Sequence, residues 1–126
     1  MTQLLHAELT HSIIGACIEV HRELGAGLLE SAYEECLCQE LRLRGIPFER
    51  QVQVPVNYKG CRLDCGYVVD LIVDGKVLLE LKAVEQIHPV FEAQLLTYLR
   101  LTKLRVGLLV NFNVPILTDG IKRKIL

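Results

Sequence analysis

The chain begins with two stretches in which apolar residues recur every three or four positions, the spacing of an amphipathic helix. The first stretch predicts a helix over residues 4–24, which a glycine-rich segment at residues 25–27 ends. The second stretch predicts a helix over residues 28–44. Gly45 follows at the position after its end, and Pro47 then blocks continuation of the helix.

The middle of the chain carries the patterns of β-strands. Residues 48–58 alternate apolar and polar side chains, which predicts a strand with one wet face, and Pro55 within it indicates an edge position. Residues 67–73 and 76–84 are apolar on both faces and flank an Asp-Gly pair at positions 74–75, a strong hairpin signal. These two segments are therefore predicted as central strands.

The last third of the chain predicts one more helix and one more strand. Pro89 opens a helix that runs to about residue 103, with His88 as a candidate cap. Residues 106–112 form an apolar run reached from a helix, which predicts a parallel strand near the middle of the sheet. Residues 116–126 predict a short helix or a frayed end. This order of elements indicates an α/β sandwich with a central mixed sheet flanked by helices.

Composition limits the size and the setting of this fold. At 126 residues and 51% hydrophobic content, the chain predicts a single domain over residues 1–126 with a sizeable core. The 14 basic and 15 acidic residues nearly cancel, so a phosphate-bearing partner must be gripped locally. No apolar run approaches the roughly 20 residues of a membrane span, and no signal peptide pattern opens the chain. We therefore expect a cytoplasmic protein with no membrane partner.

The five cysteines are odd in number and lack the paired spacing of a zinc ribbon. We interpret them as reduced thiols, because a chain of this size needs no disulfides. For Cys61 and Cys65, metal or redox ligation is the alternative, and small buried thiols are the favoured interpretation.

Two ionisable residues interrupt an otherwise apolar predicted strand. Residues 77–84 are apolar except for Glu80 and Lys82, which alternation places on one face of the strand. Burial of an unpaired charge costs several kcal/mol, so these residues need each other, a metal ion or a cleft open to water. A local ion pair is the simplest explanation. Asp70 interrupts the preceding predicted strand in the same way, which suggests instead that a shared acidic site is present.

The register of the predicted hairpin decides whether the two carboxylates meet. A two-residue turn would pair Val73 with Lys76 and would place Asp70 and Glu80 on opposite faces. A three-residue loop with a bulge would pair Ile72 with Lys76 and return the carboxylates and the lysine to one face. We predict the bulged loop.

Polar residues also lie on helix faces that should be packed. Glu30 is within about 60° of the apolar stripe of the second helix, and Gln94 is in line with the apolar residues of the third. For Glu30, a carboxylate favoured by the helix dipole is the alternative explanation. Polar residues on packed faces usually have partners, so both are candidates for the same site.

Together, these residues predict metal-assisted hydrolysis of phosphodiester bonds. Carboxylates from two adjacent strands and one helix supply the hard oxygen ligands that suit Mg²⁺. Such an ion can polarise a phosphate oxygen and lower the pKa of a bound water. A lysine at the same site, here Lys82, can help position that water and steady the developing charge.

At these positions the sequence resembles the PD-(D/E)XK nuclease superfamily, in which an aspartate on one strand precedes a Glu-x-Lys on the next. Here those positions are Asp70 and residues 80–82. More closely it resembles the bacterial GxxExxY family, whose motif appears at residues 27–33 as Gly-Leu-Leu-Glu-Ser-Ala-Tyr. The likeness spans nearly the whole chain, although Val69 stands where the superfamily's name has proline.

The resemblance implies a restriction-endonuclease-like fold and a nuclease that uses Mg²⁺ or Mn²⁺, with DNA as the expected nucleic acid. It implies metal ligation by Asp70 and Glu80, with Glu30 as an accessory ligand or orienting carboxylate, and Lys82 as the catalytic lysine. Gln94 and Tyr98 match a Gln-x-x-x-Tyr element found beside the active site in RecB-like members. A non-catalytic nucleic-acid-binding or assembly module is the alternative, and a homodimer or a protein partner is left open. The expected catalytic set is Glu30, Asp70, Glu80, Lys82, Gln94 and Tyr98.

Overall fold

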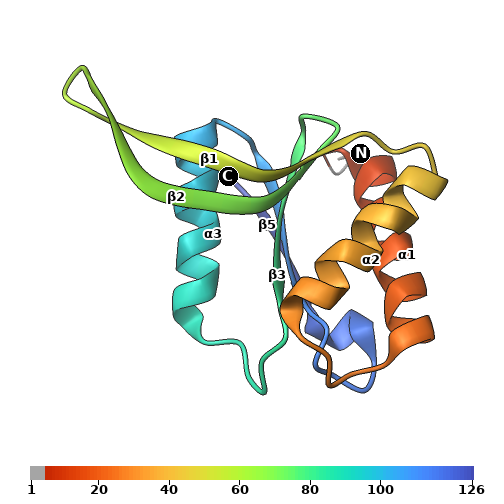
Figure 1. Cartoon of the computed structure of the whole chain (residues 1–126). Coiled ribbons are helices and arrows are strands. Elements are labelled where there is room, and N and C mark those ends of the chain that lie inside the picture. Colours follow the sequence, from red (N-terminus) through yellow and green to blue (C-terminus); the bar gives the residue numbers. More distant parts are fainter. Residues whose placement is uncertain (1–4) are drawn as a thin grey trace, which may run out of the picture.

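A computed structural model describes residues 5–126 as a mixed five-stranded sheet between two layers of helices (Figure 1). The elements are α1 (Ala7–Leu24), α2 (Glu30–Leu43), β1 (Phe48–Tyr58), β2 (Cys61–Val73), β3 (Val77–Lys82), α3 (Pro89–Thr102), β4 (Val106–Asn111), the 3-10 helix η1 (Leu117–Gly120) and β5 (Ile121–Ile125). The strands lie in the order β1-β2-β3-β4-β5, with β3 parallel to β4 and the other neighbours antiparallel. The predicted α/β sandwich around a mixed sheet is confirmed.

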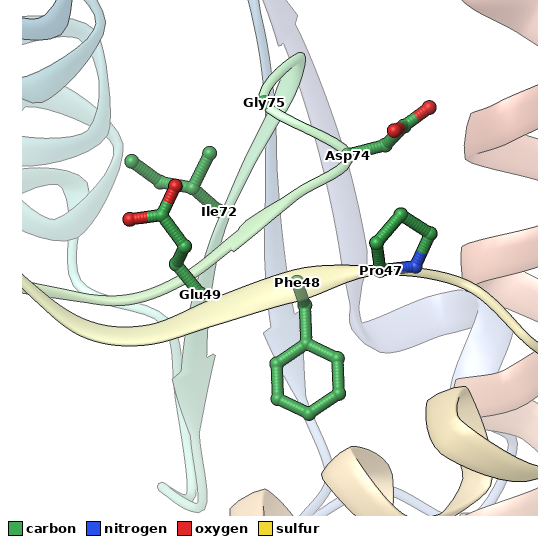
Figure 2. Close-up of a pocket in the computed structure, with 6 residues that line it drawn as sticks. All are labelled: Pro47, Phe48, Glu49, Ile72, Asp74 and Gly75. Atoms are coloured by element: carbon green, nitrogen blue, oxygen red, sulfur yellow. The ribbon is translucent and has the colours of Figure 1, made fainter.

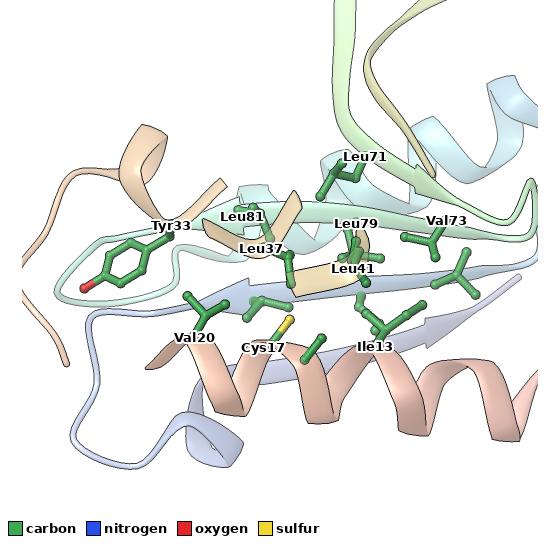
Figure 3. Close-up of a cluster of buried hydrophobic side chains, with 14 of the residues drawn as sticks. Ile13, Cys17, Val20, Tyr33, Leu37, Leu41, Leu71, Val73, Leu79 and Leu81 are labelled. Carbon is green, nitrogen blue, oxygen red and sulfur yellow. The ribbon is translucent and has the colours of Figure 1, made fainter. Parts of the chain in front are cut away.

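Each face of the sheet has its own apolar core. Helices α1 and α2 cover one face, where Ile13, Leu37 and Leu79 are fully buried (Figure 3). Helix α3 covers the other face and packs Leu95 and Leu99 against the sheet. The central strands β3 and β4 are therefore buried on both sides, which explains their continuous apolar sequences. No helix within residues 5–126 combines the length and the apolar character that a membrane crossing requires.

The helices agree with the sequence pattern except at their ends. The first helix begins at Ala7, and the predicted start at residue 4 lies outside the described residues. The second begins two residues later than predicted, at Glu30. His88 caps α3 as expected, because its Nδ1 accepts a hydrogen bond of 3.1 Å from the N–H of Val90.

The β1–β2 hairpin is longer than the sequence predicts. Strand β1 is at the sheet edge, as Pro55 indicated, but β2 begins at Cys61 rather than at residue 67. An irregular register opposite Pro55 and a positive φ of 75° at Gly66 interrupt the alternation here and conceal the strand in the sequence. Cys61 and Cys65 are exposed in this segment, so the expectation that they are buried thiols was wrong.

The end of the chain also differs from the prediction. Residues 116–126 contain η1 and then β5, an edge strand antiparallel to β4, rather than a short helix or a frayed end. Lys122, Arg123 and Lys124 hide the strand pattern, although basic residues are a common protection of exposed strand edges.

The hairpin between β2 and β3 has a bulged loop, but the predicted pairing of Ile72 with Lys76 is wrong. Val73 pairs with Val77, and Lys76 is the extra residue, its N–H donating to the Val73 carbonyl at 3.0 Å. Both residues of the turn at 74–75 have positive φ. The register is shifted by two residues from the prediction, and a shift of two preserves which side chains share a face.

Candidate active site

Asp70 and Glu80 lie where β2 separates from β3. The backbone pairing of these strands ends at Leu71 and Leu79, and beyond it the two carboxylates take over as hydrogen-bond partners. The N–H of Asp70 donates to Glu80 Oε1 at 3.2 Å, and the N–H of Leu81 donates to Asp70 Oδ2 at 2.8 Å. The carboxylates are thus held by the backbone of each other's strands, close together as the bulged loop required.

Strand β1 reverses its faces at the same level of the sheet. Arg50 contacts α2, whereas Val52, two residues on, packs with the core under α3. An ordinary strand would place both on one face. Gln51 between them has a φ of 53°, a left-handed conformation that is uncommon for a residue with a side chain. The strain therefore lies directly beside the acidic pair, where strained residues often have a functional role.

The side chain of Gln51 links the acidic pair to α2. Its Nε2 is 2.8 Å from Glu34 Oε1 and 3.4 Å from Asp70 Oδ1, and Arg50 Nε donates to Glu34 Oε2 at 2.7 Å. Our sequence analysis named neither Gln51 nor Glu34 as a site residue. Gln51 could not have been predicted, because a polar residue on an edge strand is ordinary. Glu34 could have been predicted from spacing, because it lies on the buried stripe of α2 with Tyr33 and Leu37.

The loop before α2 is fixed by a tyrosine of the 27–33 motif. The ring of Tyr33 stacks on Phe112 with centroids 4.5 Å apart. Its hydroxyl donates to the Gly25 carbonyl at 2.6 Å and accepts from the N–H of Leu28 at 3.1 Å. This clamp sets the start of α2 and with it the position of Glu30, the first residue of the helix.

A cavity of about 500 Å³ opens between α2 and the two strands β1 and β2. Four of its lining residues are polar members of the site: Glu30, Glu34, Gln51 and Asp70. Lys82 approaches from the α3 side, where its Nζ lies 4.5 Å from the centre of the Phe91 ring. In the described part of the chain, Lys82 forms no ion pair, so the local Glu80–Lys82 pair considered from the sequence is not formed.

Burial and mutual repulsion raise the pKa values of the acidic residues. Glu80 is only 8% exposed, and burial together with the charge of Asp70 raises its pKa from 4.5 to about 8. Burial also raises the pKa of Asp70. Partial desolvation also raises the pKa of the exposed Glu30, and the charge of Lys82 opposes this rise. The site therefore disfavours its own negative charge, and a cation would relieve this.

The oxygen donors of Asp70 and Glu80 suit a hard divalent cation. Mg²⁺ commonly takes only one or two carboxylates directly and keeps several of its waters. Among residues 5–126, no three acidic, histidine or cysteine side chains already converge on one point that would hold a metal ion. The structure brings Asp70 and Glu80 together, and Glu30 lines the adjoining cavity rather than joining the same hydrogen-bonded pair.

Comparison with known proteins identifies the family. The family model of the PD-(D/E)XK nuclease superfamily matches residues 7–124, nearly the whole chain. The chain belongs to the PD-(D/E)XK nuclease superfamily. No curated protein and no solved structure gives a significant match. The mixed sheet with helices on both faces agrees with the restriction-endonuclease-like fold, and nucleases of this superfamily generally use divalent metals such as Mg²⁺.

The two remaining expected site residues of this PD-(D/E)XK chain lie on α3. Gln94 is exposed and lines a second cavity, so the expectation that it is on a packed face was wrong. Tyr98 is almost buried and lines the same cavity. Burial raises the pKa of Tyr98, and the charges of Glu80, Tyr67 and Asp70 raise it further.

Another residue that the sequence analysis missed orders the chain after Lys82. Asn111, at the end of β4, is buried, and its Oδ1 accepts from the N–H of Val84 at 3.0 Å while its Nδ2 donates to the Val84 carbonyl at 2.9 Å. Both backbone groups of Val84 are thus satisfied by one side chain. This bond pair fixes the segment that follows the catalytic lysine position of the superfamily pattern.

A cavity of about 260 Å³ at the β2–β3 turn is separate from this site. It is lined by Pro47, Phe48, Glu49, Ile72, Asp74 and Gly75 (Figure 2). Figure 2 shows Glu49 and Ile72 directed to one side of the strands and Phe48 to the other. None of the superfamily motif residues lines this cavity.

Proposed function

We propose that the protein is a divalent-metal-dependent nuclease that hydrolyses phosphodiester bonds of DNA. The observation that carries this proposal is the pair formed by the buried Glu80 and the partly buried Asp70, whose charges lack a cation partner within the described residues while Lys82 is held nearby on Phe91. Two carboxylates held together away from water are costly unless a cation compensates for them. Superfamily membership supports the same chemistry.

Each residue has a role in this proposal that follows from its position. Asp70 and Glu80 hold Mg²⁺ or Mn²⁺, which when bound polarises the scissile phosphate. Lys82, with three N–H donors, hydrogen-bonds the attacking water and offsets the negative charge that develops on the phosphate. Glu30, which lines the cavity beside Asp70, acts as an accessory ligand or an orienting carboxylate. Gln94 and Tyr98 contact the substrate beside the site.

Two finer assignments belong to the same proposal. We place the chain in the GxxExxY family, because Gly27 has a positive φ, Glu30 borders the site and Tyr33 clamps the loop, which gives each motif position a physical purpose. We place the protein in the cytoplasm, since its five cysteines are all free, as suits a reducing compartment.

A non-catalytic nucleic-acid-binding or assembly module is the second candidate. The observation that favours it is that no three candidate ligands converge on one point within residues 5–126. A homodimer or a protein partner could complete the grip on nucleic acid in either case, because the net charge of the chain is only −1.

Cleavage of labelled nucleic acids tests the proposal. Single- and double-stranded DNA and RNA are incubated with the wild type in Mg²⁺, Mn²⁺ or EDTA, and with the Glu80→Gln and Lys82→Met variants. Lys76→Met, which removes an exposed lysine in the β2–β3 turn, is the matched control. We expect cleavage of DNA with metal only, a loss of roughly 100-fold or more in the two site variants, and no loss in the control. Folded wild-type protein that cleaves none of the substrates would favour the second candidate.

A further inference from the structure

The second cavity, of about 440 Å³, lies between the β1–β2 hairpin and α3. In Figure 1 the paired strands extend across α3, and the end of their hairpin projects beyond the helix. The groove is lined by Val56 and Tyr67 of the hairpin and by Val90, Ala93, Gln94, Thr97 and Tyr98 of α3. Its volume is within the range of small-molecule pockets, roughly 300–1,000 Å³.

Two tyrosines give the groove an aromatic wall. The rings of Tyr67 and Tyr98 have centroids 6.2 Å apart and planes tilted by 60°. Tyr98 is almost buried, whereas Tyr67 is 45% exposed. An aromatic side chain that is half exposed inside a groove offers a free face for stacking, and the apolar Val56 and Val90 extend this surface.

The groove also has the polar groups that a nucleotide needs. Gln94 presents an amide with donors and an acceptor, and it is exposed along the groove. Thr97 Oγ1 accepts a hydrogen bond of 3.2 Å from Arg100 Nη2, which places a guanidinium at the rim. Within the described residues no carboxylate pairs with Arg100, so its charge is available to a phosphate.

The groove borders the part of β2 that leads to Asp70. Tyr67 precedes Asp70 by three residues on β2, roughly 10 Å along the strand. Val69, which precedes Asp70, and Phe91, on which Lys82 lies, pack in the same apolar cluster as Tyr98. Lys82, stacked on Phe91 in the first turn of α3, lies on the same side of the sheet. A strand that places a phosphate at the acidic pair can therefore place a neighbouring base in the groove.

We propose that this groove binds an unstacked base of single-stranded nucleic acid, next to the phosphate that is cut. The inference rests on the proposed nuclease function and adds its substrate class. Tyr67 stacks on the base, Gln94 contacts the base edge, and Arg100 contacts a backbone phosphate. A base in a duplex is already paired and stacked, so it cannot enter the groove without an additional cost of unstacking. Aromatic stacking on single strands tolerates any sequence.

Binding measured without cleavage tests this proposal independently of the catalytic one. Fluorescence anisotropy in EDTA follows labelled 20-nucleotide single strands of DNA and RNA and a matched DNA duplex, with wild type, Tyr67→Ala, Tyr67→Phe and Ala93→Phe. The last variant fills the groove from α3. Tyr58→Ala is the control, since Tyr58 is 60% exposed at the hairpin end and does not line the groove.

We expect single strands to bind more tightly than the duplex, and Tyr67→Ala and Ala93→Phe to weaken single-strand binding roughly 10- to 100-fold. Tyr67→Phe and Tyr58→Ala should bind like the wild type. Relative affinity for DNA and RNA then identifies the natural strand.

Equal binding by wild type and Tyr67→Ala overturns the groove proposal, even if the protein cleaves DNA. A wild-type dimer in light scattering that Ala93→Phe converts to a monomer would overturn it in favour of a second copy of the chain. If no nucleic acid is cleaved but the expected binding pattern appears, only the catalytic proposal fails.

Discussion

The side-chain amide of Gln51 lies 3.4 Å from Asp70 Oδ1, and the backbone of Gln51 adopts a left-handed conformation in the middle of a strand. The same amide is bonded to Glu34, which is itself held by Arg50. Asp70 is therefore oriented from both sides, by β3 through the N–H of Leu81 and by α2 through Gln51.

Substitution of Gln51 separates backbone strain from side-chain bonding. A non-glycine residue in the left-handed region costs about 1 kcal/mol, so Gln51→Gly should unfold at a higher urea concentration than Gln51→Ala, by about 1 kcal/mol in free energy. Both should bind Mn²⁺ more weakly than wild type in calorimetry, because Asp70 loses its support. At Gln53, which has no positive φ, the order should reverse, with glycine less stable than alanine. Equal stabilities of the two variants at position 51 would contradict the strain.

Stability of the metal-free protein should fall as the pH rises from about 4.5 to about 8. The pKa of Glu80 is raised in the folded state, so the folded protein holds a proton that the unfolded chain has lost. The stability that Glu80 contributes to the folded state is therefore complete below about pH 4.5 and is lost as the pH rises to about 8. Glu80→Gln should remove much of this slope and be more stable than wild type at pH 8 by roughly 1–3 kcal/mol, measured by urea unfolding in EDTA. Parallel curves for wild type and variant would show that Glu80 ionises normally.

The Phe91 ring should help to orient Lys82. A cation over an aromatic ring gains about 0.5–1 kcal/mol at an exposed site, so Phe91→Leu should lower the cleavage rate roughly 2- to 5-fold with little change in Mn²⁺ affinity. Phe48→Leu is the control, since it removes a similar cation–aromatic contact, the one with Arg42. A rate loss shared equally by both variants would attribute the effect to general destabilisation.

The hydroxyl of Tyr33 should matter for stability as well as for the position of Glu30. Tyr33→Phe keeps the stacking on Phe112 but leaves the Gly25 carbonyl and the Leu28 N–H without their partner. Such a loss costs about 1–3 kcal/mol in the free energy of unfolding, measured with urea. The matched substitution at the exposed Tyr58 should change stability by less than about 0.5 kcal/mol. Equal effects of the two substitutions would mean that the clamp contributes nothing.

Periodicity identified most of the fold because it reports local burial. The two-sided apolar runs of β3 and β4 and the stripes of α1 and α2 follow directly from their positions between layers. The prediction for residues 116–126 was wrong because β5 is half exposed and basic, and such a sequence matches no simple strand pattern. The bulged loop was predicted, and its pairing was wrong by two residues, an error that does not move side chains between faces.

The sequence predicted the site less well wherever a site residue is positioned by tertiary contacts. Asp70, Glu80 and Lys82 stood out because charges are rare in buried strands. Gln51 did not, because its left-handed conformation is imposed by the reversal of faces between Arg50 and Val52, which no local pattern encodes. For Gln94 the spacing predicted a packed helix face, but a groove lies between α3 and the β1–β2 hairpin at this position.

The hydrogen bonds between the acidic pair and the backbone also bear on which site residues should be conserved among related chains. An acceptor oxygen at positions 70 and 80 closes the gap between β2 and β3, so selection for folding alone would retain Asp70 and Glu80 after any loss of chemistry. The side chain of Lys82 closes no such gap, and its described contact is with the Phe91 ring. Among related chains, the residue at position 82 is therefore the better record of whether the ancestral reaction is still under selection.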